Sequence, residues 1–237
     1  MSKQLTLKIA LRDGLRFSSF YCNDQNSQTY FTLKAFSEAS QVIGIQQIFL
    51  WGEVKSGKSH LLQACCYQLA EQGLHASYLP LRTLSLYGTR ILSGLHNSDL
   101  IVIDDIDAVL GDKDWEEALF NLINNALSAG QRLLFSATKN PRDLACYLPD
   151  LSSRLIWGSS YQITGLSNQE KPKILQSRAQ QRGFSLDDRV IDYIYKRHPR
   201  DMDSLLEILD RLDRESLRQK AKITIPFVKQ VLESKHS

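Results

Sequence analysis

A glycine-rich segment followed by lysine and serine is the strongest chemical signal in the sequence. It reads GEVKSGKS, lies between a short apolar run and a helical pattern, and is typical of a loop that wraps around phosphate groups. Glycines allow close backbone approach, and the N–H groups that begin the helix point at the phosphates. Lys58 would reach the terminal oxygens, while Ser59 would offer a hydroxyl to Mg²⁺. The predicted cofactor-binding residues here are Gly52, Ser56, Gly57, Lys58, Ser59 and His60.

Two carboxylates end a later apolar run, LIVIDDID. Ligands of parallel α/β sheets bind beyond the carboxyl ends of the strands. We therefore expect Asp104 to join the Mg²⁺ shell and Asp105 to sit where a base or water-positioning carboxylate belongs. The alternative is a strand that merely ends in turn-forming aspartates, and the phosphate-binding loop upstream favours the metal site.

A further polar strand end and two arginines complete the candidate site. The stretch LLFSATKNP ends in Ser136 and Thr138, which we expect beside the terminal phosphate, with Thr138 positioning water. Arg154 is expected on the same rim of the sheet. Arg200 opens a long predicted helix, where a positive charge opposes the helix dipole and so indicates an anionic partner. The structural alternatives are hydroxyls that close a strand, a surface ion pair of Arg154 with Asp150, and a solvated Arg200.

A parallel sheet is needed to bring these residues together. Short apolar runs rich in β-branched and aromatic residues predict strands at 47–51, 75–79, 100–103, 132–135 and 161–164. Helices are expected between them at 58–72, at 114–128 behind a D-x-x-E capping box, and briefly after Asn140-Pro141. This alternation implies right-handed crossovers and a mostly parallel sheet. The first forty residues have only weak periodicity.

After about residue 166 the pattern becomes helical throughout. The segment S-N-Q-E at 167–170 is a second capping box, and helices are expected over 168–182, 188–198, 201–220 and 225–234. The longest predicts a packing stripe of Leu205, Ile208, Leu209, Leu212 and Leu217. The sequence thus predicts an α/β nucleotide-binding domain over 21–165 and a small all-α lid domain over 166–237.

The composition is that of an ordinary globular protein and excludes several classes. Of 237 residues, 43% are hydrophobic and 23% charged. The longest apolar run, 144–148, is far shorter than a membrane span, and no secretory signal is visible, so we expect a cytoplasmic protein. The four cysteines form no C-x-x-C pair, which argues against zinc. The net charge of +3 is too mild to indicate nucleic acid, and the basic residues from 166 onward alternate with acids, as on a solvated face.

Taken in this order, the motifs resemble those of the AAA+ ATPases. The order of features along the chain is characteristic. It runs from a phosphate loop to a strand end with two acidic residues, then to a third strand with a polar end, a later arginine, and a helical lid with another arginine. More narrowly, the chain resembles the bacterial replication initiator DnaA and, closer still, the shorter Hda family. The resemblance covers essentially the whole chain through LWGEVKSGKSHLLQA, LIVIDDID, LPDLSSRLIWG, RGFSLDD and TIPFVKQVL. It implies a P-loop AAA+ module with a central parallel five-stranded sheet, followed by an all-α lid.

The resemblance also implies roles for single residues and a cofactor, ADP or ATP with Mg²⁺. The matching positions are Lys58 and Ser59 in the phosphate loop, Asp104 and Asp105 as the Walker B pair, Thr138 as sensor 1, Arg154 as an arginine finger and Arg200 as sensor 2. Asp105 is one methylene shorter than the Glu of most AAA+ motors. We therefore expect slow intrinsic turnover at best.

Segment 1–20 resembles the N-terminal region by which Hda proteins dock on the replicative sliding clamp. The docking residues would be Gln4, Leu5, Leu7 and Ile9, in an extended strand that places apolar side chains in a groove. Lys8 stands where the family has proline, which raises the ordering entropy and weakens docking by up to about 1 kcal/mol. The alternative is a disordered tail without a partner.

The implied function is regulatory. Hda, carrying its own nucleotide and held by the DNA-loaded clamp, makes DnaA hydrolyse its bound ATP and so prevents a second initiation. We expect no sequence-specific DNA binding, because the chain leaves no room for the helix-turn-helix domain of the initiator. The sequence leaves open whether the protein forms a homodimer. Two alternatives also stay open: an ATP-driven helicase loader related to DnaC, and a general DNA-binding replication factor.

Overall fold

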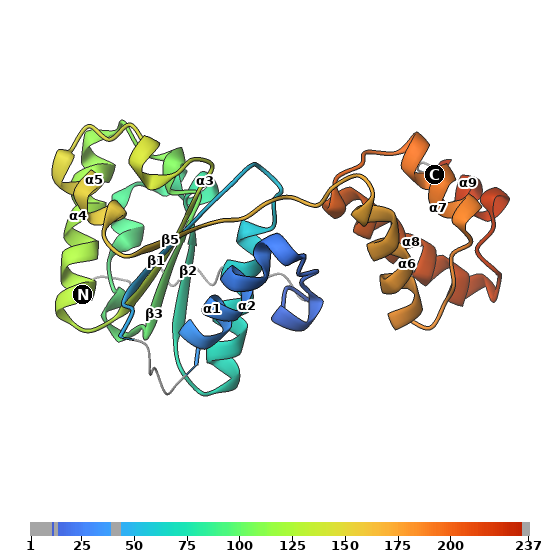
Figure 1. Cartoon of the computed structure of the whole chain (residues 1–237), viewed down its shortest axis with the longest axis horizontal. Coiled ribbons are helices and arrows are strands. Elements are labelled where there is room, and N and C mark those ends of the chain that lie inside the picture. Colours follow the sequence, from blue (N-terminus) through green and yellow to red (C-terminus); the bar gives the residue numbers. More distant parts are fainter. Residues whose placement is uncertain (1–10, 12–13, 39–43, 234–237) are drawn as a thin grey trace. The chain divides into compact units, whose positions relative to one another are not determined.

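The chain divides into two compact units, Met1–Gly165 and Leu166–Ser237. The computed structural model describes residues 11, 14–38 and 44–233 (Figure 1). The expected clamp-docking residues Gln4, Leu5, Leu7 and Ile9 lie outside these residues, so their role stays a prediction. Among the described residues, no helix combines the length and the apolar character that crossing a bilayer requires.

Five parallel strands form the centre of the first unit, which confirms the predicted sheet. They are β1 (Gln47–Trp51), β2 (Ala76–Pro80), β3 (Leu100–Asp104), β4 (Arg132–Ala137) and β5 (Ser159–Gln162). Their spatial order is β2-β3-β4-β1-β5. The central strands β3 and β4 are buried along their whole length, because helices cover both faces of the sheet. The edge strands are more exposed, and both begin one or two residues away from the predicted position.

Two layers of helices cover the sheet. On one face lie α1 (Ser27–Phe36) and α2 (Lys58–Glu71), and on the other lie α3 (Leu81–Leu84), α4 (Lys113–Ser128) and α5 (Pro149–Ile156), as Figure 1 shows. Seven 3₁₀ turns connect the described elements. They are η1 (Phe17–Ser19), η2 (Asp24–Asn26), η3 (Ser85–Tyr87), η4 (Thr89–Leu92), η5 (Leu95–Asn97), η6 (Ile106–Ala108) and η7 (Pro141–Asp143).

Helix α1 was not predicted from the sequence. Its face toward the sheet buries Thr29, Leu33 and Phe36, yet the large side chain of Phe31 is 65% exposed. An apolar residue on the solvent side weakens the amphipathic pattern on which a helix prediction depends.

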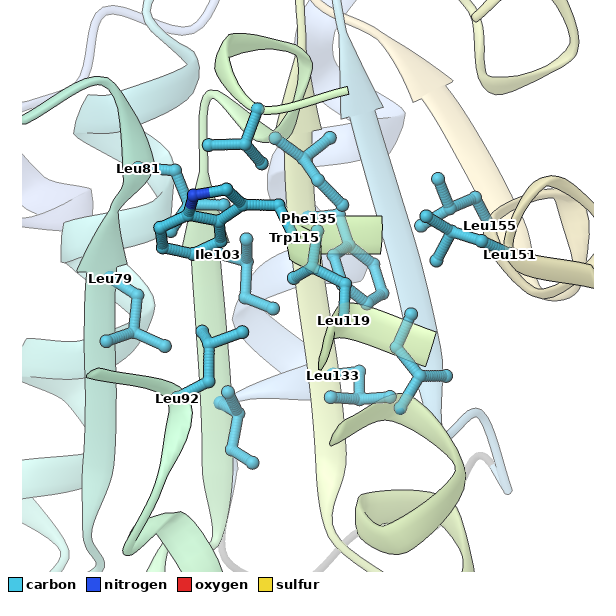
Figure 2. Packing of buried hydrophobic residues seen from close by; sticks show 14 of the residues in the cluster. Leu79, Leu81, Leu92, Ile103, Trp115, Leu119, Leu133, Phe135, Leu151 and Leu155 are labelled. Atoms are coloured by element: carbon cyan, nitrogen blue, oxygen red, sulfur yellow. The ribbon is translucent and has the colours of Figure 1, made fainter. Parts of the chain in front are cut away.

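Helix α4 packs its apolar stripe against the sheet. Trp115 and Leu119 lie one turn apart and contact strand residues such as Phe135, as Figure 2 shows. The predicted cap at Asp114 is wrong, because the helix already begins at Lys113. The capping side chain belongs to Asp112, whose carboxylate accepts from the amides of residues 114 and 115 at 3.0 and 3.2 Å.

Helix α5 lies further along the chain than predicted. The residues after Asn140-Pro141 make only the turn η7, and the α-helix starts at Pro149, where proline is favoured at the first helical position. Its Leu151 and Leu155 are almost fully buried and point from one face of the helix toward the core cluster (Figure 2).

The described part of the second unit, residues 166–233, contains four α-helices around its own apolar core. They are α6 (Glu170–Gln181), α7 (Asp188–Arg197), α8 (Met202–Gln219) and α9 (Ile225–Glu233). The second capping box is confirmed, since the Ser167 amide donates to the Glu170 carboxylate at 2.7 Å and the Glu170 amide to the Ser167 hydroxyl at 3.3 Å.

The predicted stripe on α8 is correct except for its last member. Leu205, Ile208, Leu209 and Leu212 are buried, whereas Leu217 is 73% exposed. At 3.6 residues per turn, five residues beyond Leu212 place Leu217 roughly 140° around the helix axis. The leucine therefore belongs to the solvent face.

Candidate nucleotide-binding site

The glycine-rich loop joins the end of β1 to the start of α2. Gly57 is the N-cap residue of α2 and has φ 106°, a conformation that glycine adopts at little cost. No side chain caps this helix start. The first N–H groups of α2, together with the positive end of its dipole, therefore face the hollow of the loop.

Gly52 and Gly57 lie so close to neighbouring groups that a side chain at either position would clash with them. A Cβ at Gly52 would lie 2.2 Å from the carbonyl oxygen of Ile163, and a Cβ at Gly57 would lie 2.9 Å from the ring of Phe20. Both contacts are shorter than real Cβ contacts. The loop is thus packed between the segment after β5 and the N-terminal turn.

Lys58 is buried at the base of the loop. Its ammonium donates to the carbonyl oxygens of Gly52 and Glu53, both at 2.8 Å. Burial lowers the pKa of Lys58, and the neighbouring carboxylates of Asp105, Asp104 and Asp107 partly oppose this effect. These two bonds use two of the three ammonium protons, which leaves a donor for an anionic ligand.

Asp104 ends β3 as a buried carboxylate that accepts one hydrogen bond at each oxygen. Oδ1 accepts a hydrogen bond from the Ser136 hydroxyl, and Oδ2 accepts one from the Tyr78 hydroxyl at 2.5 Å. Tyr78 also accepts from the Gln63 amide at 3.3 Å, and burial raises its pKa, so the phenol remains a donor. Ser136 therefore orients Asp104, and its hydroxyl is not directed at a phosphate as the sequence predicted.

Asp105 holds the left-handed backbone conformation, with φ 55°. Its amide donates to the Ser136 hydroxyl at 2.9 Å, and its carboxylate accepts from the Arg82 Nε at 2.9 Å. The bond to Asp105 raises the pKa of Arg82. The residue expected to act as a base is thus paired with a cation that the sequence analysis did not identify.

Thr138 follows β4, where the sequence placed it, but its hydroxyl already has an acceptor. Both its amide, at 3.0 Å, and its hydroxyl donate to Oδ2 of Asp107. The other oxygen, Oδ1, is buried without a hydrogen-bond partner among the described residues. Asp107 belongs to the LIVIDDID motif, yet only the fold shows that it anchors Thr138.

The described contacts of His60 lie on the N-terminal turn, and its role in cofactor binding stays a prediction. Its Nε2 lies 3.0 Å from the carbonyl oxygen of Arg16 and 3.1 Å from the Ser19 hydroxyl. Its ring packs edge-to-face on Phe20, with 5.3 Å between the ring centres. In the described structure His60 therefore connects α2 to the N-terminal turn.

Arg154 lies at the opposite rim of the sheet from the phosphate loop, so the prediction of a shared rim is wrong. The carbonyl oxygens of Arg154 and Trp157 accept from the Gln47 side chain at 2.8 and 3.2 Å, and Gln47 is the first residue of β1. The loop follows the other end of that strand, roughly 13 Å away at about 3.3 Å per residue. The suggested ion pair with Asp150 is not among the ion pairs of the described residues.

Arg200 belongs to the second unit, just before the N-cap residue Asp201 of α8. Its Nε donates to the carbonyl oxygen of Tyr195 at 3.1 Å, and its guanidinium lies 5.1 Å from the centre of the Tyr195 ring. The side chain is exposed, so these contacts orient the guanidinium without burying it.

Three features of the loop fit the phosphate chain of a nucleotide. The start of α2 is uncapped, Lys58 has a remaining donor, and the hydroxyl of Ser56 is buried without a hydrogen-bond partner among the described residues. Ser59 and Asp104 would hold the Mg²⁺ of such a nucleotide. Within the described ranges, no three His, Cys, Asp or Glu side chains form a cluster that could hold a metal ion.

Comparison with known proteins gives matches along most of the chain. A family model described as the Hda lid domain matches residues 168–232, and one described as the bacterial DnaA ATPase domain matches residues 89–162. An uncharacterized protein of Haemophilus influenzae is 39% identical over 233 residues, which cover 98% of this chain and 99% of that protein.

Solved structures show the same fold at low sequence identity. Domain III of the replication initiation protein DnaA from Thermotoga maritima has a TM-score of 0.75 and 17% identity, over 94% of this chain and 98% of that chain. DnaA from Aquifex aeolicus, bound to the ATP analogue AMPPCP, has a TM-score of 0.70 and 20% identity, over 89% of this chain and 70% of that chain. A protein of this fold thus binds an adenine nucleotide.

Proposed function

Since the chain belongs to the Hda-like, DnaA-related AAA+ proteins, we propose that it stimulates the hydrolysis of ATP carried by DnaA and so limits replication initiation. The observation that carries the proposal is the position of Arg154. Its helix is anchored at the far end of β1 from the chain's own phosphate loop. Among the described residues, no carboxylate forms an ion pair with the Arg154 guanidinium. This position supports a role for Arg154 on the nucleotide of another molecule.

Arg154 would act as an arginine finger on the ATP of DnaA. Charge spreads over the γ-phosphate oxygens as the phosphoryl group is transferred, and a guanidinium stabilises that charge. A finger supplied by a partner accelerates the reaction roughly 10³- to 10⁵-fold, which corresponds to about 4 to 7 kcal/mol of barrier. This contribution is large enough to switch an otherwise slow ATPase.

The chain's own nucleotide, ADP or ATP, would serve mainly to hold the active conformation. Gly52, Ser56, Gly57 and Lys58 would bind its phosphates, and Arg200 would contribute from the lid. Ser59 and Asp104 would hold a Mg²⁺ ion, which would neutralise phosphate charge when bound. The ion pair of Arg82 with Asp105 supports slow intrinsic turnover, because it occupies the carboxylate that would activate water.

Docking on the DNA-loaded sliding clamp would bring this chain to DnaA. Gln4, Leu5, Leu7 and Ile9 would form the docking strand, in the cytoplasm where the initiator acts. Neither a self-association step nor sequence-specific DNA binding is needed for this scheme. The same ion pair at Asp105 argues against an ATP-driven helicase loader, since a motor depends on rapid hydrolysis of its own ATP.

The test is a reconstituted hydrolysis assay that contains this protein, a clamp loaded on duplex DNA, and DnaA charged with radiolabelled ATP. Each component is omitted in turn. The proposal predicts rapid conversion of DnaA-bound ATP to ADP only when all components are present. Hydrolysis that is independent of DnaA would instead indicate a motor, and binding to duplex DNA that falls steeply with salt in the absence of the clamp would indicate a DNA-binding factor.

A further inference from the structure

A buried carboxylate ties together two loops next to the helix that carries Arg154. Glu116 of α4 is 0% exposed. Its Oε1 accepts hydrogen bonds from the amides of Gly111, at 2.7 Å, and Tyr147, at 2.9 Å. Its Oε2 accepts one from the amide of Leu148, at 2.6 Å. Three backbone donors from two separate loops therefore converge on one side chain.

Backbone amides, rather than a cation, stabilise this charge. No Lys, Arg or His of the described residues forms an ion pair with Glu116. A buried carboxylate is unfavourable unless it is hydrogen-bonded, and charge-assisted bonds are short and directional. Burial raises the pKa of the nearby Cys146 thiol to about 11, and the neighbouring Glu116 carboxylate adds to this effect. The two loops are therefore held in the positions that satisfy the carboxylate.

Both loops lead to residues of the proposed reaction. Gly111 closes the loop that leaves the Asp105–Asp107 segment, and Tyr147 and Leu148 lead directly into α5. Leu148 is the N-cap residue of α5 and provides no side-chain cap. Glu116, from another helix, accepts from the amides of Tyr147 and of the N-cap residue Leu148, so it holds the segment that enters α5, although it does not bond the first-turn amides that a capping side chain would bond.

The apolar contacts of α5 cannot supply the same restraint. Leu151 and Leu155 press one face of the helix against the core, but such contacts are non-directional and leave the helix free to slide and tilt by small amounts. Hydrogen bonds to the N-cap residue fix where the helix axis begins. Arg154 lies in the second turn of that helix, between this anchored start and the Gln47 side chain, which donates to the carbonyl oxygens of Arg154 and Trp157. The start of the helix is therefore one of two directional restraints on the position of Arg154.

We propose that Glu116 is a positioning residue for Arg154: its carboxylate anchors the start of α5 and thereby sets where the guanidinium meets the nucleotide of the partner. The expected effect on DnaA hydrolysis rests on the proposed function. The anchoring of α5 rests only on the hydrogen bonds of Glu116. Displacements of about 1 Å at a reacting group can cost on the order of a hundredfold in rate.

The test compares Glu116→Gln with Glu117→Gln, which makes the same change at the next residue. Glu117 is exposed, and its one described ion pair is with Lys113 at 3.8 Å, so this variant is the matched control. A glutamine at position 116 turns an NH₂ group toward amides that need an acceptor. We expect faster hydrogen exchange, by tenfold or more, confined to the amides of Tyr147, Leu148 and the first turn of α5.

The functional arm measures the maximal stimulation of DnaA hydrolysis and the protein concentration that gives half of it. Positioning predicts a tenfold or greater loss of maximal stimulation in Glu116→Gln, with nucleotide binding and the half-saturating concentration unchanged. The control should match the wild type in every measurement. If Glu116→Gln folds poorly, Glu116→Asp keeps the charge but shortens its reach, and it should show the same local pattern to a smaller degree.

Two results would overturn the proposal. One is stimulation by Glu116→Gln equal to that of Glu117→Gln. The other is exchange that accelerates uniformly through the α/β unit in both position-116 variants, which would mark a purely global role in stability. Failure of the proposed function is distinguishable, because the wild-type protein would then give no stimulation while the exchange measurement still tests the anchoring of α5.

Discussion

Replacing Gly52 by alanine tests the packing that shapes the phosphate loop. The new Cβ would lie 2.2 Å from the carbonyl oxygen of Ile163, whereas real Cβ contacts stay above 3.0 Å. The two groups must therefore separate by about 0.8 Å. Ile163 is 1% exposed and its amide donates to Trp51 at 2.7 Å, so its carbonyl cannot yield without disturbing the end of β1.

The expected cost has two parts. Both Gly52 and Gly73 have a positive φ, 156° and 76°, so alanine at either position introduces backbone strain of about 1 to 2 kcal/mol. A Cβ at Gly73 meets nothing within 4 Å, so Gly73→Ala carries the strain alone. Overpacking at Gly52 adds about 1 to 3 kcal/mol. We expect Gly52→Ala to lose about 2 to 5 kcal/mol of unfolding free energy and Gly73→Ala about 1 to 2.

Urea unfolding followed by circular dichroism measures the unfolding free energy of both variants. Equilibrium titration with ADP measures their nucleotide affinity, which reports on the phosphate loop. Gly52→Ala should also lose nucleotide affinity, because the displaced backbone belongs to the phosphate cradle, whereas Gly73→Ala should bind like the wild type. The reasoning is refuted if Gly52→Ala is no less stable than Gly73→Ala and binds ADP equally well.

Three further changes test other parts of the site. Arg82→Ala should free Asp105 and raise intrinsic ATP hydrolysis by up to about fivefold, because an exposed ion pair contributes less than about 1 kcal/mol; unchanged single-turnover hydrolysis would contradict this inhibitory role. Lys58→Ala should purify with little bound nucleotide, as measured by chromatography of the heat-released nucleotide, and full occupancy would show that the loop binds without its lysine. Replacing Leu5 and Leu7 by alanine should abolish clamp binding in surface plasmon resonance, and retained binding would mean that another surface docks.

Much of the architecture could be predicted because burial leaves a strong pattern in the sequence. The runs QIFLW and LIVI are continuous apolar segments, and they form β1 and the buried part of β3. The phosphate loop was visible for a similar reason, since its residue types are set by local backbone geometry. Leu217 shows the limit of such patterns, because it is apolar but lies roughly 140° around the helix from Leu212, on the solvent face.

The partners of the site residues could not be predicted, because they depend on strand order. Tyr78 reaches Asp104 only because β2 lies beside β3, with Pro80 paired to Asp104. Arg154 was placed on the wrong rim because the loop before α5 is longer than expected and returns the helix to the start of β1. Leu119 and Ile123 of the buried stripe follow Glu116 at three and seven residues, so helical periodicity places Glu116 on the buried face and Glu117 beside it. The backbone amides that satisfy its carboxylate come from distant loops and could not be predicted.

The most direct test of the central claim measures the single-turnover rate at which DnaA-bound ATP is hydrolysed, with clamp and DNA present. The rate in the presence of the Arg154→Ala variant is compared with the rate in the presence of Arg142→Ala, a control at an exposed arginine. The account predicts that Arg154→Ala lowers the stimulated rate about 10³-fold or more while its own ADP affinity stays at the wild-type value. Arg142→Ala should stimulate normally. Full stimulation by Arg154→Ala would contradict the claim that this guanidinium acts on the nucleotide of another molecule.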